Sequence, residues 1–564
     1  MNNDTIVGEV AAPGLGAFDI EAKLDKSKIK VIAVSATATV FEWFDFFLYG
    51  SLAVTISRHF FSGVNESTAF VLALLAFAAG FAVRPFGALV FGYLGDRWGR
   101  KSTLLVALGL MGVATFTMGL VPSYAKIGVA APWILVALRM LQGLSVGGVY
   151  GGAAIYVAEH APQARRGLYT SWIQITPTVG MALSLIVIFG TRMFIGEPEF
   201  SKWGWRVPFL LSSVLLAVTM WIQLQLSESP VYAQMKASGR SSARPWADAF
   251  GNWSNLRRIL VALFGAMIGQ AVIWYTAQFY VLFFLERVLK VDGALTNLLV
   301  AAALFISTPL YLFFGWLSDR IGRRPVVLGA CLLAALTYFP LFKALTYAAN
   351  PDLARAVATS PVTVFADKRE CSLQFDPIGK AKFKTSCDIA RSYLASAGVT
   401  YETVAAPAGT IAELRVGEHA LTSFRGEQLP AESFAQRRTA WSEQAGGLLA
   451  AAGYPSHANS ANLNIPLVLL ILTAIMSFAA MVYGPMAALL TELFPARVRY
   501  TSMSFPYHLA IGWFGGFLPT VAFAIVAATG DIYSGLWYPL VLSALTFVVG
   551  LCLLPETRHA DIRS

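Results

Sequence analysis

Twelve apolar stretches, each of roughly 17 residues or more, recur from one end of the 564-residue chain to the other. A helix of that length crosses most or all of ~30 Å of hydrocarbon, and a backbone in lipid must satisfy its own hydrogen bonds. Each stretch therefore predicts a transmembrane helix. The predicted spans are Val31–Ser57, Ala69–Gly92, Leu104–Val121, Trp133–Ala158, Leu168–Thr191, Val207–Leu226, Ile259–Leu285, Leu295–Leu317, Val326–Phe342, Ile465–Leu490, Met503–Ala528 and Leu536–Leu554.

Charge is scarce and unevenly placed along the chain. Only 13% of the residues are charged, against about 25% in a soluble domain, which argues against a large soluble helical core. The net charge of +10 comes from cations that collect in alternate short loops, the pattern of the positive-inside rule. We therefore expect both termini and the loop Ser227–Asn255 in the cytoplasm, with no nucleic-acid partner. The first span is expected to act as an uncleaved signal anchor.

An internal repeat divides the chain into two halves. The segment Gly92–Lys101 recurs as Gly315–Arg324, an offset of 223 residues (92 to 315). A weaker echo has an offset of 333 residues (159 to 492), and it pairs Glu159, Pro162 and Arg166 with Glu492, Pro495 and Arg499. The difference of about 110 residues predicts an insertion between the second and fourth helices of the second half, where the sequence turns polar.

These signals predict an all-α membrane protein of two six-helix pseudo-repeats with a small α+β extracytoplasmic insertion. The expected units are a cytoplasmic tail (1–29), a first six-helix bundle (30–226), a cytoplasmic central loop (227–256), a second bundle (257–345 and 463–555), the periplasmic insertion between helices 9 and 10 (346–462) and a cytoplasmic tail (556–564).

The insertion contains Cys371 and Cys387, and an oxidising periplasm favours a disulfide between them. Residues 362–365 and 373–375 are predicted to be strands, and residues 386–397 a helix. A lid, a docking site and a passive ornament remain open as roles for this domain.

The repeated loop has the chemistry of a conformational latch. Its glycines permit a tight turn, and its aspartates can accept from helix N-termini or from arginines. A latch that forms in one conformation and breaks in the other suits alternating access, and the alternative is a positive-inside anchor with structural aspartates. The candidate gating residues are Asp96, Arg97, Arg100, Asp319, Arg320, Arg323, Glu159 and Glu492.

Ionisable residues inside predicted spans are costly and therefore candidates for function. Glu42, Asp45 and Tyr49 share one face of the first helix, at spacings of three and four residues. Arg84 and Arg139 lie in the second and fourth helices. Two carboxylates beside two arginines predict a proton site (Asp45, Glu42, Arg139) next to an anion site. Buried ion pairs that lock the helices together are the structural alternative.

Polar and aromatic residues elsewhere in the spans predict the wall of a substrate cavity. Gln270, Trp274 and Gln278 recur at every fourth position of the seventh helix. The full set of candidate substrate-binding residues is Arg84, Arg139, Tyr49, Gln142, Gln174, Gln270, Trp274, Gln278 and Tyr507. No nucleotide-binding loop, metal cluster or catalytic nucleophile stands out, so we expect no enzyme activity, no metal and no cofactor, and an ion gradient as the source of energy.

Several motifs resemble the major facilitator superfamily and, within it, the metabolite:H⁺ symporter family of bacterial inner membranes. They are the repeated loop, Arg139-x-x-Gln142-Gly143, Pro555-Glu556-Thr557, the segment Glu42–Gly50, Arg84-Pro85-Phe86-Gly87, Gly147–Ala153 and Glu159-His160-Ala161-Pro162. The resemblance implies two bundles that rock about a central site, and substrates such as dicarboxylates, shikimate-like acids, proline or betaine. It also implies that Glu42, Asp45, Arg84, Arg139 and Asp96 serve coupling, binding and gating.

One position departs from that family pattern, because Val149 stands where relatives usually carry an acidic residue. Coupling is then expected to depend on Glu42 or Asp45. The leading hypothesis is a monomeric proton-driven importer of a small organic acid in a bacterial inner membrane. A zwitterion symporter with a cation–π site, an exporter of the same fold and a ligand sensor are the alternatives.

Overall fold

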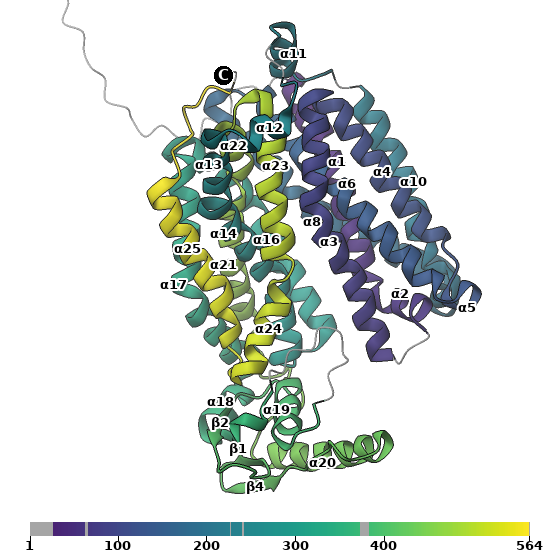
Figure 1. Ribbon diagram of the computed structural model, residues 1–564, viewed down its shortest axis with the longest axis vertical. Coiled ribbons are helices and arrows are strands. Elements are labelled where there is room, and N and C mark those ends of the chain that lie inside the picture. Colours follow the sequence, from purple (N-terminus) through teal and green to yellow (C-terminus); the bar gives the residue numbers. More distant parts are fainter. Residues whose placement is uncertain (1–25, 63–65, 226, 240–241, 373–382, 563–564) are drawn as a thin grey trace, which may run out of the picture.

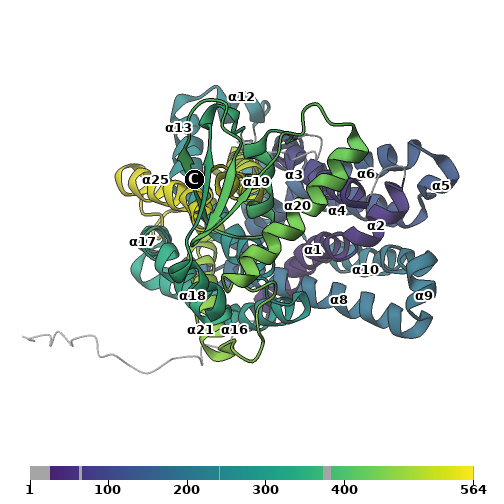
Figure 2. The same cartoon turned by 90° about the horizontal axis from the view of Figure 1, so that it is seen from below.

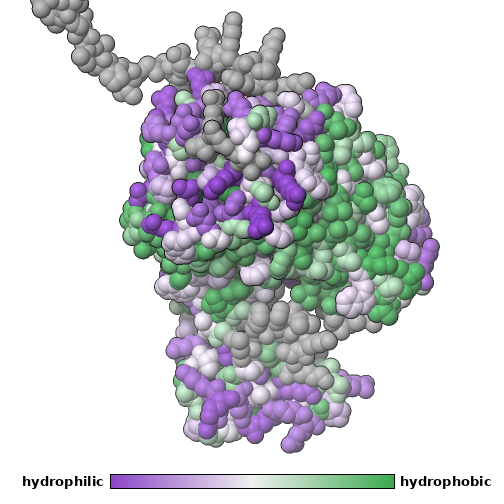
Figure 3. Space-filling model, turned by 45° about the horizontal axis from the view of Figure 1, so that its top comes forward, coloured by the Kyte–Doolittle hydropathy of each residue, from purple (hydrophilic) through white to green (hydrophobic). Residues whose placement is uncertain are grey.

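The computed structural model describes residues 26–62, 66–225, 227–239, 242–372 and 383–562. In this part of the chain, 12 helical segments are long and apolar enough to cross a membrane, which confirms the predicted helical membrane fold. Hydrophobic side chains form a belt around the helices, between a hydrophilic end and the hydrophilic inserted domain (Figure 3).

The first bundle contains six spans and three short connecting helices. The spans are α1 (Lys26–Ser51), α3 (Glu66–Arg97), α4 (Arg100–Leu120), α6 (Ala130–His160), α7 with α8 (Arg166–Ser171 and Thr176–Ile195) and α10 (Arg206–Leu224). The connecting helices are α2 (Ala53–Phe60), α5 (Tyr124–Ile127) and α9 (Glu197–Glu199).

The second bundle repeats this plan with more irregular helices. Its spans are α13, α14 and α15 (Trp253–Ala262, Ile268–Tyr275 and Val281–Phe283), α16 (Gly293–Ile321), α17 (Arg323–Ala349), α21 with α22 (Ile465–Tyr483 and Met486–Leu493), α23 with α24 (Arg499–Leu509 and Leu518–Thr529) and α25 (Trp537–Leu553). Wider π-helical turns join the pieces of the seventh span at Leu263–Met267 and Thr276–Tyr280, and a third, Phe284–Val288, ends it.

The two bundles lie side by side, close together at one end and diverging toward the other (Figure 1). Two short helices of the central loop, α11 (Pro230–Ala237) and α12 (Pro245–Phe250), lie at the end where the bundles meet. The C-terminus lies at the same end. We call it the latch end, and the opposite end, which carries the inserted domain, the insert end.

The inserted domain is a four-stranded sheet flanked by helices. The strand order is β2-β1-β3-β4, in which β1 pairs with β2 in parallel and with β3 antiparallel, and β3 pairs antiparallel with β4. The strands are β1 (Val362–Ala366), β2 (Tyr401–Ala405), β3 (Glu413–Val416) and β4 (His419–Thr422), and the helices are α18 (Pro351–Thr359), α19 (Ser386–Ser396) and α20 (Ala431–Ala451).

The local predictions for this domain can be compared with the structure. The strand predicted at 362–365 and the helix predicted at 386–397 correspond to β1 and α19. The strand predicted at 373–375 lies outside the described residues. A disulfide bond joins Cys371 to Cys387.

The domain is attached to the second bundle by hydrogen bonds and by a shared core. Tyr401 N donates to Gly530 O at 2.9 Å, and Arg391 Nη2 donates to Ala528 O at 2.5 Å. A cluster of buried apolar side chains runs from the bundle into the sheet. The insertion is therefore joined to the insert end of the second bundle.

Candidate functional site

Close packing of α3 against α6 positions the two arginines. A Cβ atom added at Gly143 would lie 2.0 Å from Gly80 O, and one added at Gly87 would lie 2.0 Å from Leu144 O. Small residues of this kind let helix backbones approach closely in a membrane. The contact brings Arg84 of α3 and Arg139 of α6 to the same small cavity, which also faces α1.

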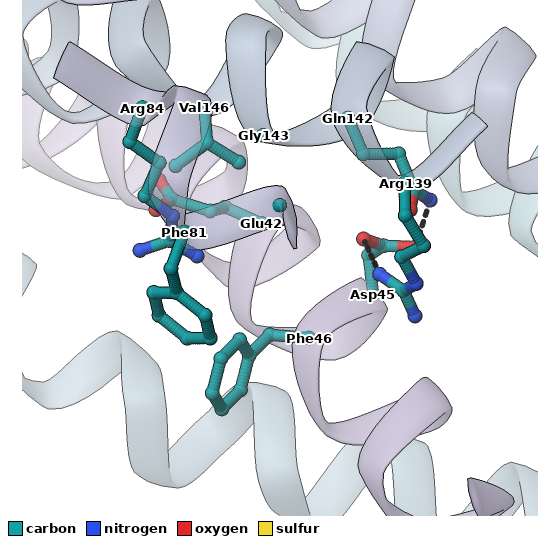
Figure 4. Close-up of a pocket in the computed structure, with 10 residues that line it drawn as sticks. Glu42, Asp45, Phe46, Phe81, Arg84, Arg139, Gln142, Gly143 and Val146 are labelled. Carbon is teal, nitrogen blue, oxygen red and sulfur yellow. Dashed lines mark hydrogen bonds and ion pairs between the residues drawn. The ribbon is translucent and has the colours of Figure 1, made fainter. Parts of the chain in front are cut away.

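Asp45 of α1 is fully engaged by its neighbours. Its Oδ1 accepts from Thr115 Oγ1 at 2.7 Å and from Gln142 Nε2 at 2.8 Å. Its Oδ2 lies 3.6 Å from Arg139 Nη1 (Figure 4), and the Arg139 guanidinium lies 3.5 Å from the centre of the Tyr49 ring. This carboxylate is 3% exposed, so it is stabilised by the paired arginine and by two neutral donors.

Glu42 and Arg84 lie on the other side of the cavity (Figure 4). Both are buried, and among the described residues neither Glu42 Oε2 nor Arg84 Nε has a hydrogen-bond partner. The Arg84 guanidinium lies 4.3 Å from the centre of the Phe81 ring and 5.9 Å from that of Phe46. Because buried polar atoms are normally paired, these two groups have capacity left for a ligand or a proton.

The cavity between the four charged groups measures about 20 Å³. That volume admits roughly one water molecule and is far below the ~300 Å³ of an organic ligand site. In this conformation the four charged side chains are therefore tightly packed around a very small cavity. Within the described part of the chain, no group of three or more His, Cys, Asp or Glu side chains could hold a metal ion.

Aromatic rings close the centre between the two bundles. Tyr150 of α6 stacks on Tyr507 of α23 with ring centres 3.9 Å apart, and Trp43 of α1 packs against Trp274 of α14 at 5.3 Å. Gln174 Nε2 donates to the Tyr150 hydroxyl at 2.9 Å. Two of the predicted substrate residues, Gln174 and Tyr507, thus join the bundles through one tyrosine.

The predicted stripe on the seventh span is buried but does not line the small cavity. Gln270, Trp274 and Gln278 are 1%, 4% and 9% exposed. Gln278 lies within the π-helical turn Thr276–Tyr280, so the spacing of four no longer keeps it on the same face as Trp274. Sequence spacing cannot reveal a π turn, which is why the stripe is less regular than expected.

Val149 lies fully buried against apolar neighbours that include Phe91 and Leu104. It does not line the central cavity, whereas Val146, one turn earlier on α6, does. The substitution at this position therefore leaves the four charged residues of the cavity in place.

At the latch end, the aspartate of each repeated loop binds the N-terminus of a helix in the opposite bundle. The Asp96 carboxylate accepts from the backbone N–H groups of Tyr500 (3.1 Å) and Thr501 (2.9 Å), at the start of α23. The Asp319 carboxylate accepts from those of Gly167 and Leu168, both at 2.8 Å, at the start of α7. Each carboxylate thus neutralises the positive end of a helix dipole from the other half.

Buried arginines donate to the same two aspartates. Arg100 Nη1 donates to Asp96 at 2.9 Å, and Arg323 Nη1 donates to Asp319 at 2.7 Å. Two ion pairs also cross between the bundles and follow the same pseudosymmetry. They are Arg166–Glu492 at 2.8 Å and Arg499–Glu159 at 2.7 Å.

Two further carboxylates, to which the sequence assigned no role, cap the helices that follow the two repeated loops. Glu228 accepts from the backbone N–H groups of Arg100 and Lys101, and Glu556 accepts from those of Arg323 and Arg324. The residues that follow them, Ser229 and Thr557, donate to Glu159 and Glu492, respectively. A signal was present, because Glu-Ser follows the sixth span and Glu-Thr follows the twelfth.

Two predicted gating residues do not reach across. Arg97 is exposed and donates to the Tyr93 hydroxyl, one turn earlier in its own helix. Arg320 is also exposed and lies over the ring of Trp316 in its own helix. Within the two repeated loops, the buried arginines are Arg100 and Arg323, four residues after each aspartate.

The chain was compared with known families and proteins. The family model described as "Sugar (and other) transporter" matches residues 31–244, 233–366 and 444–563. A proline/betaine transporter of Salmonella typhimurium is 34% identical over 328 residues, which are 56% of this chain and 64% of that protein. The alignment thus spans less than two thirds of that relative's length. A citrate-proton symporter of Salmonella typhi is 35% identical over 318 residues, 56% of this chain and 71% of that protein.

Solved structures match the fold over nearly the whole chain. A double-tryptophan mutant of the xylose transporter XylE gives a TM-score of 0.62 at 14% identity, covering 95% of this chain and 98% of that one. The proton:xylose symporter XylE with a bound bromodeoxyglucose gives 0.56 at 16% identity, covering 95% and 98%. At such identities the likeness concerns the fold, which is that of the major facilitator superfamily. The chain belongs to the sugar (and other) transporter family.

Proposed function

We propose that the chain is a secondary active transporter that carries a small organic acid into the cell together with protons, by alternating access. One observation carries the proposal: two carboxylates and two arginines lie buried around one cavity between helices α1, α3 and α6. Relatives named as proton symporters, such as the citrate-proton symporter, support it.

The charge balance of the cavity suggests how proton and substrate are coupled. Glu42, Asp45, Arg84 and Arg139 together carry no net charge when all four are ionised. Protonation of Glu42, the less satisfied carboxylate, leaves one excess positive charge beside Arg84. A substrate carboxylate then restores neutrality, which a site shielded from water strongly favours. Proton and organic anion are thereby bound together.

The latch supplies the second element of alternating access. Helix-dipole contacts and ion pairs hold the bundles together at the latch end, so this conformation would exchange solute with the insert end. Binding of proton and substrate in the central cavity would have to weaken first the aromatic contacts between the bundles and then the contacts of the latch. A rocking motion between two such states is the established behaviour of transporters built from repeated bundles.

We further propose that the latch end faces the cytoplasm. Basic residues gather in its loops, as the positive-inside rule requires, and include Arg97, Arg100, Lys101, Arg165, Arg166, Arg320, Arg323, Arg324, Arg497 and Arg499. Both chain termini would then be cytoplasmic, and the insertion would be periplasmic, where its disulfide is stable. All residues of the site come from one chain, so a monomer is sufficient.

The test records external pH in lightly buffered, de-energised cells that express the protein. Organic acids, amino acids and betaines are added one at a time, with Glu42→Gln and Asp45→Asn cells as controls. Transient alkalinisation with an organic acid, absent in Glu42→Gln cells, is the expected result. No alkalinisation with any compound, while the protein is present in the membrane, contradicts proton-coupled import.

A zwitterion such as proline or betaine is the second candidate substrate. The stacked rings of Tyr150 and Tyr507 and the pair Trp43–Trp274 supply faces that could hold a quaternary amine by cation–π contact, while Arg84 holds its carboxylate. In the same assay, alkalinisation with betaine rather than with organic acids favours this candidate. Its loss in Trp274→Leu cells would assign the cationic group to the aromatic wall.

A further inference from the structure

A second and much larger cavity lies outside the central site, where the inserted domain meets the second bundle. It measures about 560 Å³ and is bounded by the end of the seventh span, the loop that leads into α16, helices α19 and α20 and the segment after α20. It shares no residue with the central cavity. Seen from the insert end, α20 crosses from the side of α16 and α21 toward α3 and α6 (Figure 2).

The backbone of Lys290 is held in an uncommon conformation in the wall of this cleft. Its φ of 56° makes it the only non-glycine residue with positive φ in the described part of the chain. Its carbonyl accepts from Ala458 N at 3.0 Å, and its Nζ donates to Pro455 O at 3.1 Å. Left-handed backbone at a residue other than glycine is costly and tends to persist at functional positions.

The cleft contains two basic side chains, Lys290 and Arg287. Lys290 is half-buried, and in the described residues neither it nor Arg287 forms an ion pair with a carboxylate. Two carboxylates, Glu286 and Asp292, also line the cleft, and Asp292 caps α16 by accepting from Leu295 N at 3.0 Å. Burial lowers the pKa of the Lys290 ammonium below its ordinary value. An anion bound in the cleft would offset this desolvation.

The rest of the wall suits the body of a small organic molecule. Apolar and aromatic surface comes from Val291, Leu449, Tyr393 and Tyr454. Gly446 leaves room for the Tyr393 hydroxyl, because a Cβ atom there would lie 3.0 Å from it. A volume of several hundred Å³ whose walls combine apolar and aromatic surface with charged groups suits a small organic ion.

We propose that this cleft binds a small carboxylate-bearing solute at the insert end, separately from the central site. Lys290 and Arg287 hold the carboxylate, and the aromatic wall packs against the carbon skeleton. Such a site would hold solute at the insert end of the second bundle. The binding step does not depend on the proposed transport function, because it involves different residues and needs no proton gradient.

The test measures equilibrium binding of radiolabelled citrate, 2-oxoglutarate and glycine betaine to the full-length protein in lipid nanodiscs. The background variant is Arg84→Ala, in which the central anion site is removed. We expect saturable binding of at least one of the two organic acids to this variant. Lys290→Gly should weaken it by about tenfold or more, whereas Arg355→Ala, which removes an exposed cation of the same domain, should leave it unchanged.

Lys290→Gly is the preferred variant because glycine adopts positive φ without strain, so loss of folding is not expected. Unchanged affinity in Lys290→Gly, or no saturable binding of any probe to Arg84→Ala protein, overturns the proposal. Transport that fails while cleft binding persists would count against the proposed function only.

Discussion

The Glu159 carboxylate of α6 accepts a hydrogen bond from Arg499 of α23 at 2.7 Å, although 340 residues separate them in the chain. Both side chains are buried, and the pair joins one bundle to the other. Its pseudosymmetric counterpart, Arg166 with Glu492, does the same from the opposite direction. Each half therefore contributes one acid and one base to a closure that neither half could form alone.

Removing Arg499 should loosen the latch end. Breaking a buried ion pair leaves an uncompensated charge and typically costs about 3–5 kcal/mol. In Arg499→Ala protein, the Tyr500 and Thr501 amides, which donate to Asp96, should exchange hydrogen at least about tenfold faster. Hydrogen–deuterium exchange of detergent-solubilised protein measures this. Arg497→Ala, an exposed neighbour, is the control, and equal exchange in both variants would refute the latch.

The two carboxylates of the central cavity should respond differently to neutralisation. Asp45→Asn leaves Arg139 buried without its anionic partner, so we expect a fall in thermal stability worth about 3–5 kcal/mol. Glu42→Gln should cost less stability than Asp45→Asn. It also leaves an excess positive charge beside Arg84, but Glu42 Oε2 has no hydrogen-bond partner to lose in the described structure. Thermal unfolding of the two purified variants gives the comparison, and a larger loss in Glu42→Gln would contradict it.

Transport assays test the role of Glu42 in coupling. Glu42→Gln should abolish accumulation against a gradient but retain exchange of labelled for unlabelled substrate, because a neutral Glu42 mimics the protonated carrier. Loss of both activities in a stable Glu42→Gln protein would instead assign that residue to substrate binding.

The contact between α3 and α6 should tolerate no added side chain. A methyl group at Gly143 would lie 2.0 Å from Gly80 O, so Gly143→Ala must push the helices apart. Overpacking of this kind costs about 1–3 kcal/mol, and it also moves Arg84 relative to Arg139. Gly109→Ala, on α4, meets no atom within 4 Å and should be neutral or slightly stabilising. Melting temperatures of the two variants decide the point.

The disulfide should stabilise the inserted domain alone. Closing a loop of 16 residues is worth about 3 kcal/mol in the chain-entropy model. A Cys371→Ser, Cys387→Ser double variant should therefore become sensitive to protease within the insertion, while the membrane bundles stay intact. Cys552→Ser, which removes an exposed free thiol, is the matched control, and equal sensitivity would mean that the bond contributes nothing.

Anion binding in the cleft between the inserted domain and the second bundle should weaken as pH rises. Burial lowers the pKa of Lys290, so its ammonium loses charge at a lower pH than that of an exposed lysine, and affinity falls with it. The other titratable groups that face the cleft are Glu286, Arg287, Asp292, Tyr393, Tyr454 and His457.

Binding of citrate to Arg84→Ala protein between pH 7.5 and pH 10 provides the measurement. Lys290→Arg, which stays charged over that range, should show the smaller decline. An identical pH profile in both proteins would exclude Lys290 as the titrating group.

Much of this architecture can be predicted from local sequence. The apolar spans, the repeated loop and the polar segment after the ninth span are properties of neighbouring residues, because a lipid environment demands continuous apolar helices. The same logic marks Glu42, Asp45, Arg84 and Arg139 as candidates, since an ionisable group inside a span is rarely accidental.

Only the tertiary structure decided which of those groups are partners. Asp45 is satisfied by Thr115, Gln142 and Arg139, whereas Glu42 and Arg84 keep unpaired atoms, and no spacing in the sequence distinguishes the two carboxylates. The π turns of the seventh span, the capping of the latch by Glu228 and the left-handed Lys290 were likewise decided by packing. Hydrogen-bond partners are set by which helices meet, and that depends on contacts between residues hundreds of positions apart.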